Sequence, residues 1–187
     1  MTTTVFLSGS RSIARLSSPV RDRLENIMQR AMPVIIGDAN GADKALQLCL
    51  ANAAYEPVTI FAAGDRCRNN MGAWEIRFIN TGADLKGRDF YAQKDKAMAK
   101  EAGYGFILWD GESPGSINNA LELIHQAKPA LIWFAPEKTF YTIKNIPDLE
   151  GLLKRCSGDA RQELEQKIQL TRTLRAIGAA AQPSLAL

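Results

Sequence analysis

The chain has 187 residues, 46% of them hydrophobic, and its 23 Lys and Arg residues slightly outnumber its 20 Asp and Glu residues. This length suits one domain with a full hydrophobic core. The basic residues are scattered rather than clustered, which argues against nucleic acid as a partner. Three widely spaced cysteines and a single histidine, His125, indicate neither a disulfide framework nor a zinc site. We therefore expect no metal and no cofactor.

The sequence also carries information about the compartment. Its first ten residues lack the charged and apolar regions of a signal peptide. No apolar stretch approaches the roughly 20 residues that a membrane-spanning helix needs. Because cysteines without a disulfide pattern are typical of a reducing compartment, we expect a cytoplasmic protein with no membrane partner.

Short apolar runs alternate with helical patterns along most of the chain. Strands are predicted at Val5–Arg11, Val34–Ile36, Val58–Ala62, Tyr104–Trp109 and Ala130–Ala135. Strands separated by helical patterns of about ten to fifteen residues favour right-handed βαβ units. The sequence thus predicts an α/β fold: a Rossmann-like, doubly wound, mainly five-stranded parallel sheet with flanking helices.

A long segment between the third strand and the next helix departs from this alternation. Glycines interrupt residues 63–89, and only Ala73–Ile79 shows a short helical pattern. Long loops in compact domains are usually functional or disordered. We therefore expect part of this segment to belong to a binding site.

The regular pattern also weakens beyond Pro136. Phe140–Ile143 is interpreted as a short extended segment, Ile146–Cys156 as a small helix and Asp159–Ala179 as one amphipathic helix. We assign residues 157–187 to a C-terminal helical extension and tail of the same domain. The apolar stripe of the last helix packs either on its own domain, which we favour, or on a second copy.

Small polar loops follow three of the predicted strands. Their candidate ligand-binding residues are Ser8, Gly9, Ser10 and Arg11 after the first strand, Gly37, Asp38, Asn40 and Gly41 after the second, and Gly111, Ser113, Gly115 and Ser116 after the fourth. Because open α/β sheets bind ligands at the carboxyl ends of their strands, we expect these residues to line one site. Gly115 and Ser116 begin a helix, whose first N–H groups attract anions, and are the best phosphate cradle.

The long loop adds further candidates. Arg66 and Arg68, together with Arg11, could hold phosphate oxygens through paired N–H donors, or could be solvated loop charges. Asn69 could hydrogen-bond a base or a ribose. Trp74 could stack on a base or pack in the core.

Three of these segments together resemble a known superfamily: Ser8–Arg11, Gly37–Asp43 and Trp109–Ser116. They are similar to the SLOG superfamily over about residues 4–136. Its relatives include cytokinin-activating phosphoribohydrolases, the Rossmann domain of DNA-processing protein A and sensor domains of bacterial defence systems. The resemblance implies a Rossmann-like domain, here residues 1–156, that binds nucleotides or nucleotide-derived small molecules.

Some members of this superfamily cleave an N-glycosidic bond and carry the signature P-G-G-x-G-T-x-x-E. Here Gly115–Ser116 matches the G-T pair, whereas Asn119 stands at the position of the glutamate. A neutral amide does not supply the negative charge that stabilises an oxocarbenium-like centre. A replacement carboxylate would come from Asp43, Asp95 or Asp110.

These acids have other interpretations. Asp38 and Asp43 accept hydrogen bonds from ribose hydroxyls or act on a glycosidic bond, or else they cap the loop and the helix. Asp95 lies in the middle of a helix, where a side chain on the solvated face is the default interpretation. We include it as a catalytic candidate only because related nucleoside-processing folds look similar in placing an acid there.

Three functions are therefore compatible with the sequence. The first is binding of a nucleotide-derived small molecule, in a sensor or effector role such as a defence system. The second is an N-glycosidase-type hydrolase that acts on a nucleotide. The third is an interaction module or homo-oligomer that uses the C-terminal helix.

Overall fold

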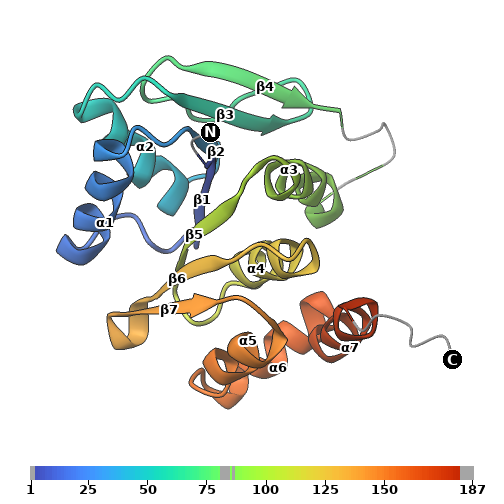
Figure 1. Cartoon of the computed structure of the whole chain (residues 1–187). Coiled ribbons are helices and arrows are strands. Elements are labelled where there is room, and N and C mark those ends of the chain that lie inside the picture. The colour runs from blue at the N-terminus through green and yellow to red at the C-terminus, as the bar shows by residue number, and fades with distance from the viewer. Residues whose placement is uncertain (1–2, 81–84, 86, 182–187) are drawn as a thin grey trace, which may run out of the picture.

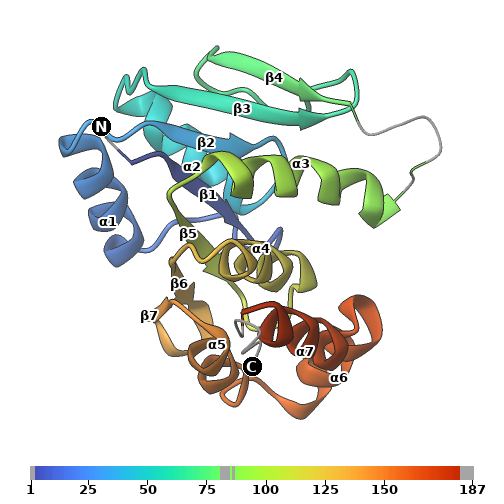
Figure 2. The same ribbon diagram turned by 45° about the vertical axis from the view of Figure 1, so that its right-hand side comes forward.

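The computed structural model describes residues 3–80, 85 and 87–181. It shows an open α/β sheet with helices on both faces (Figures 1 and 2). The strands are β1 (Val5–Gly9), β2 (Val34–Gly37), β3 (Val58–Ala63), β4 (Glu75–Ile79), β5 (Tyr104–Trp109), β6 (Ala130–Phe134) and β7 (Thr139–Ile143). Their order is β4-β3-β2-β1-β5-β6-β7, and all neighbours are parallel except β6 and β7.

The five predicted strands are confirmed, but the sheet has seven strands among the described residues. The extended segment expected at Phe140–Ile143 is the strand β7, Thr139–Ile143, which pairs antiparallel to β6 because only a short 3₁₀ turn, Ala135–Glu137, joins the two strands. The predicted helix at Ala73–Ile79 is wrong. Residues Glu75–Ile79 instead pair with β3 as an edge strand, since the backbone ladder offered by β3 outweighs a short helical pattern.

The helices form two layers over the sheet. They are α1 (Ser18–Gln29), α2 (Ala42–Asn52), α3 (Gly87–Glu101), α4 (Pro114–His125), α5 (Ile146–Leu153), α6 (Gly158–Ile168) and α7 (Leu170–Ala181). Helices α1 and α2 pack on one face, where Leu7 and Ile36 point, while α3 to α7 cover the face of Phe6 and Ile35. Successive strand residues therefore serve opposite layers, as the pleat of a strand dictates.

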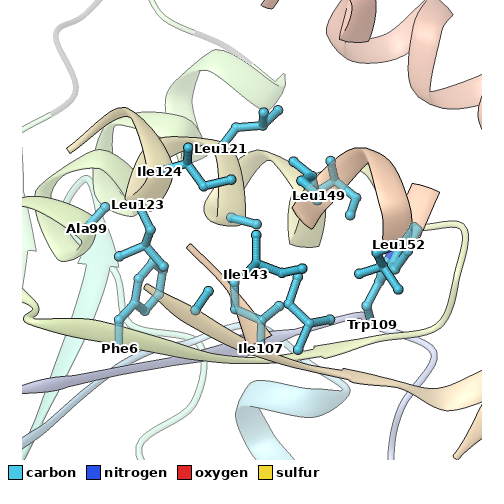
Figure 3. Close-up of a cluster of buried hydrophobic side chains, with 14 of the residues drawn as sticks. Phe6, Ala99, Ile107, Trp109, Leu121, Leu123, Ile124, Ile143, Leu149 and Leu152 are labelled. Carbon is cyan, nitrogen blue, oxygen red and sulfur yellow. The ribbon is translucent and has the colours of Figure 1, made fainter. Parts of the chain in front are cut away.

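The core beneath α4 and α5 is densely apolar. Phe6, Ile107 and Trp109 rise from the sheet towards Leu123 of α4 and Leu152 of α5 (Figure 3). These side chains are at most 1% exposed. A site near this layer is thus built on a rigid support.

The C-terminal extension is two helices rather than the single one predicted. The helix is interrupted at Gln169, whose backbone is in the left-handed region with φ 47°. This residue lets α7 fold back, so that Leu164 of α6 and Leu174 and Ile177 of α7 enter the same core cluster. The apolar stripe of α7 therefore packs on its own chain, which confirms the alternative that we favoured.

In the described part of the chain, no helix combines the length and the apolar character that crossing a membrane requires.

Packing of the extension into the common core predicts that its loss destabilises the whole domain. Leu164 is fully buried, so Leu164→Ala should lower the free energy of unfolding by about 2 to 5 kcal/mol. The matched control is Leu48→Ala, at a side chain that is 43% exposed, with an expected change within about 0.5 kcal/mol. Urea unfolding followed by circular dichroism measures both. A separate early transition that leaves the sheet folded would contradict this integration.

Candidate functional site

A cavity of about 480 Å³ opens at the carboxyl edge of the sheet. It lies where the strand order reverses, with β2 on one side of β1 and β5 on the other. Open α/β sheets bind ligands at such a switch point. The walls come from the ends of β1 and β2, from α3 and from the first turn of α4. Of the predicted residues, the lining includes Ser8, Gly9, Ser10, Arg11, Gly37, Asp43, Arg68, Asp95, Ser113, Gly115 and Ser116.

The first turn of α4 forms one end of the cavity. Pro114 occupies the start of the helix, and the side chain of the N-cap residue Ser113 makes no capping hydrogen bond. A Cβ added to Gly115 would meet no atom within 4 Å, so the cavity reaches the helix backbone there. The hydroxyls of Ser10 and Ser116 lie 3.1 Å apart and join the β1 loop to this turn. The arrangement leaves the positive end of the helix dipole facing open space.

Asp110 holds the loop in front of α4 rather than lining the cavity. Its carboxylate accepts hydrogen bonds from the backbone N–H groups of Glu112 and Ser113 and from the hydroxyls of Ser12 and Ser113. Burial alone would raise the pKa of Asp110, but these donors outweigh it and lower the pKa. The structure therefore places this catalytic candidate in a loop-stabilising position. Gly111 beside it has φ +90° and serves the turn.

Two of the predicted glycines are explained by packing. A Cβ on Gly9 would lie 2.6 Å from the carbonyl oxygen of Leu108 and 2.7 Å from the Cβ of Ala42. Gly41 has φ +80°, and a Cβ there would lie 2.1 Å from the carbonyl oxygen of Arg11. Both glycines allow the first loop, α2 and β5 to approach closely, so their main role is to permit this packing beside the cavity.

Asp38 joins the second loop to the long loop after β3. Its two carboxylate oxygens accept from Arg68 Nη2 at 2.6 Å and Nε at 3.0 Å. Burial would raise the pKa of Asp38, but the hydrogen bonds and charge of Arg68 lower it overall. Asn69 donates to the carbonyl oxygen of Asp38 and to Asn40 Oδ1. Asp38, Asn40 and Asn69 are thus committed to internal contacts, and only Arg68 of this network reaches the cavity.

The remaining two candidates lie elsewhere. Arg66 is exposed and does not line the cavity. Trp74 immediately precedes β4, so it lies at the amino edge of the parallel sheet, where its Nε1 donates to the carbonyl oxygen of Tyr55. The predicted stacking of Trp74 on a ligand in this cavity has no geometric basis, because residues 75–79 form a strand instead of a helix.

Two buried ionisable residues, Asp43 and Lys94, and the partly exposed Asp95 form the other end of the cavity. Asp43 of α2 is 5% exposed, and Lys94 of α3, which the sequence did not single out, is also 5% exposed. Lys94 Nζ lies 2.8 Å from Asp95 Oδ1. A Cβ on Gly37 would lie 2.5 Å from Asp43 Oδ2 and 2.6 Å from Lys94 Nζ. Gly37 therefore makes room for a carboxyl group and an ammonium group at the end of β2.

The pKa values of this cluster reflect burial first. Burial raises the pKa of Asp43 to about 6, a shift that the charge of Lys94 opposes and that of Asp95 reinforces. Burial would lower the pKa of Lys94, but Asp95 and Asp43 outweigh it and raise the pKa. The cavity thus holds a carboxyl group that changes charge near neutral pH beside a permanent cation.

Asn119 is a second cavity residue whose role the sequence did not predict. Its Nδ2 donates to Ser8 Oγ at 3.1 Å, and its buried Oδ1 has no hydrogen-bond partner among the described residues. A buried acceptor without a partner is costly, and a ligand donor can remove that cost. Two signals pointed to the missed residues: the helical pattern of residues 90–102, in which Lys94 shares a face with Ala97 and Met98, and the signature position occupied by Asn119.

No group of three or more His, Cys, Asp or Glu side chains that could hold a metal ion occurs among the residues that the structure describes. Comparison with models of protein families, with curated proteins and with solved structures finds no significant match to this chain. The resemblance to the SLOG superfamily therefore rests on the sequence segments alone, and the cavity has to be interpreted from its own chemistry.

The raised pKa of Asp43 predicts a pH-dependent stability. Because burial raises the pKa of folded Asp43 from its ordinary value of 3.8 to about 6, the protonated carboxyl group stabilises the fold fully below the ordinary pKa, and this stabilisation is lost as pH rises through 6. Wild type should therefore lose about 2 kcal/mol relative to Asp43→Asn between pH 4 and pH 7. Urea unfolding at several pH values measures this difference. Asp22→Asn, on the exposed face of α1, should track wild type, and parallel profiles for wild type and Asp43→Asn would contradict the prediction.

Proposed function

We propose that this protein binds a nucleotide or a nucleotide-derived small molecule in the cavity at the carboxyl edge of the sheet, in a sensor or effector role. The observation that carries the proposal is the division of the cavity into two chemically different ends. The first turn of α4 lies at one end, and a cluster of carboxyl groups with one buried ammonium group lies at the other. A Rossmann-like fold and the resemblance to the SLOG superfamily would both agree with nucleotide binding.

The α4 end suits an anionic group. The first turn of α4 offers a positive dipole end, and Gly115 allows the ligand to approach the backbone. Arg11 lines the same cavity from the β1 loop. A phosphate bound here would meet N–H donors and a cation, and Asp110 in front of the helix is already committed to its own loop.

The opposite end suits hydrogen-bond donors. The carboxyl groups of Asp43 and Asp95 would repel a second phosphate but accept from sugar hydroxyls or base N–H groups. Tyr91, under the guanidinium of Arg68 at 4.7 Å, provides an aromatic wall. The volume of the cavity lies within the range of about 300–1,000 Å³ that is usual for small-molecule sites. A phosphate at one end and a hydroxylated ring at the other matches a nucleotide.

A negative charge introduced at Gly115 tests whether the α4 end of the cavity binds an anion. The position is open, so Gly115→Asp and Gly115→Asn both fit, and the acid is also compatible with a helix N-terminus. Gly115→Asp should weaken binding of AMP or ADP-ribose at least about tenfold by repulsion, and the isosteric Gly115→Asn should weaken it clearly less. Isothermal titration calorimetry measures both affinities. Absence of binding by wild type, or equal losses in the two variants, would refute the proposal.

A second function is favoured by the position of Asp43. This carboxyl group lines the cavity and has a pKa raised to about 6, which suits a general acid near neutral pH. In N-glycoside hydrolysis, Asp43 would give its proton to the leaving base nitrogen as the C–N bond breaks. Water would form the new C–O bond at the anomeric carbon and return a proton to Asp43. The products are a free base and a sugar phosphate.

Hydrolysis is tested by incubating the purified protein with AMP, ADP-ribose and other nucleotides, and by measuring free base by chromatography. If Asp43 is the general acid, wild type should release base and Asp43→Asn should be at least about 100-fold slower. The control Asp22→Asn should match wild type. Unchanged substrate across the panel, or full activity in Asp43→Asn, would leave binding as the sole function.

A further inference from the structure

Lys94 is an unusual residue for the inner face of a helix. It lies in α3, yet only 5% of it is exposed, and its ammonium group is 2.8 Å from Asp95 Oδ1 and 4.0 Å from the sulfur of Met98. A buried lysine costs free energy unless it is paired, and a lysine on the outer face of α3 would avoid that cost. Its burial in a cavity wall therefore calls for a role beyond packing.

The position of Lys94 is set by two neighbours. Asp95 pairs with the ammonium group from the same helix. Gly37 lies beneath it, since a Cβ there would come within 2.6 Å of Nζ. Any larger residue at the end of β2 would push the ammonium group away. The end of β2 and the neighbouring acid thus hold one cationic atom in a defined place.

The position that a Cβ on Gly37 would occupy is also close to Asp43. Asp43 Oδ2 would lie 2.5 Å from that Cβ, so the carboxyl and ammonium groups face each other across Gly37. Asp43 Oδ2 accepts from the backbone N–H of Ala39 at 3.2 Å. Asp43 and Lys94 both line the cavity, where a ligand can reach them.

We propose that Lys94 is a positioning residue: held by Asp95 and Gly37, its ammonium group sets the charge of the Asp43 carboxyl group that receives the donors of the ligand. The part about the ligand rests on the proposed function, whereas the effect of Lys94 on Asp43 is a property of the protein alone.

The charges around Asp43 support this role. Lys94 and Asp95 face it from α3, Asp38 from the loop after β2, and Arg68 from the loop after β3. Lys94 lowers the pKa of Asp43, whereas burial, Asp95 and Asp38 raise it. Lys94 is therefore the main opposing influence on a carboxyl group that would otherwise stay protonated at higher pH. Without it, the cavity would present a neutral acid to the ligand over a wider pH range.

Titration of Asp43 in the ligand-free protein tests the proposal. The Asp43 side-chain carbon signal can be followed by NMR from pH 4 to pH 9 in protein labelled with ¹³C-aspartate. Lys94→Met, whose side chain suits the apolar surroundings of Met98, should raise the midpoint by at least about one pH unit. Asp95→Asn should lower the midpoint, because it removes a negative charge near Asp43 while the introduced amide oxygen can still accept a hydrogen bond from Lys94 Nζ. Lys94→Arg should return it towards wild type.

Opposite shifts in two adjacent variants distinguish positioning from a structural role. If burial alone set the titration, Lys94→Met and Asp95→Asn would both titrate like wild type, and that outcome overturns the proposal. Lys96→Met, on the exposed face of the same helix, is the matched control and should leave the midpoint unchanged. Should Lys94→Met fail to fold, Asp95→Asn still decides, since an unchanged or raised midpoint in that variant also overturns the proposal.

A second measurement uses AMP as the probe. Lys94→Met should bind AMP about tenfold more weakly than wild type at pH 7, and Lys94→Arg should recover most of the loss. Equal affinity of Lys94→Met and wild type would overturn the ligand part of the proposal. If wild type binds no nucleotide, the proposed function fails, while the NMR titration still decides whether Lys94 controls Asp43.

Discussion

The absence of a side chain at Gly37 is the constraint on which the cavity depends. The last residue of β2 lies directly under Asp43 of α2 and Lys94 of α3, and a single methyl group there would collide with both. Its carbonyl oxygen also accepts a hydrogen bond from Gln47 at 2.8 Å. One strand end therefore organises a helix from each face of the sheet, which is possible only because the backbone itself occupies so little space.

The polar residues around this point divide into those that build the site and those available to a ligand. Asp38 and Asn69 form hydrogen bonds within the loops, and the buried Gln47 connects α2 to the long loop after β3 by hydrogen bonds. Gly115 and Asn119 are different, because the first borders open space and the second retains an unpaired acceptor. Preorganised loops and unsatisfied groups in one cavity are the usual elements of a binding site.

Burial gives the carboxyl groups of the site different chemical roles. Asp38, paired with Arg68, has a lowered pKa, whereas Asp43, with a more distant cation and less hydrogen bonding, has a raised one. Two acids that lie five residues apart in the sequence are thus separated into a structural anion and a group that can exchange a proton. The two proposed functions, binding and hydrolysis, would both use the carboxyl group of Asp43.

Local sequence patterns were sufficient for the alternating α/β order and for the loops that meet at the carboxyl edge, because hydrophobic periodicity and strand-end glycines act over short distances. They also placed Ser116 and Asp43 at the edge of the sheet where both residues line the cavity. They did not reveal that β4 is a strand, that Gln169 breaks the last helix, or that Trp74 lies at the opposite edge of the sheet. Each of these depends on partners distant in the chain: the free edge of β3, the common core under α4, and the direction of an added strand. The sequence alone thus determined the fold class and the edge that carries the site. Only tertiary packing decided which polar residues line the cavity. Once the loops have come together, some polar side chains are buried in internal hydrogen bonds and others stay accessible to a ligand.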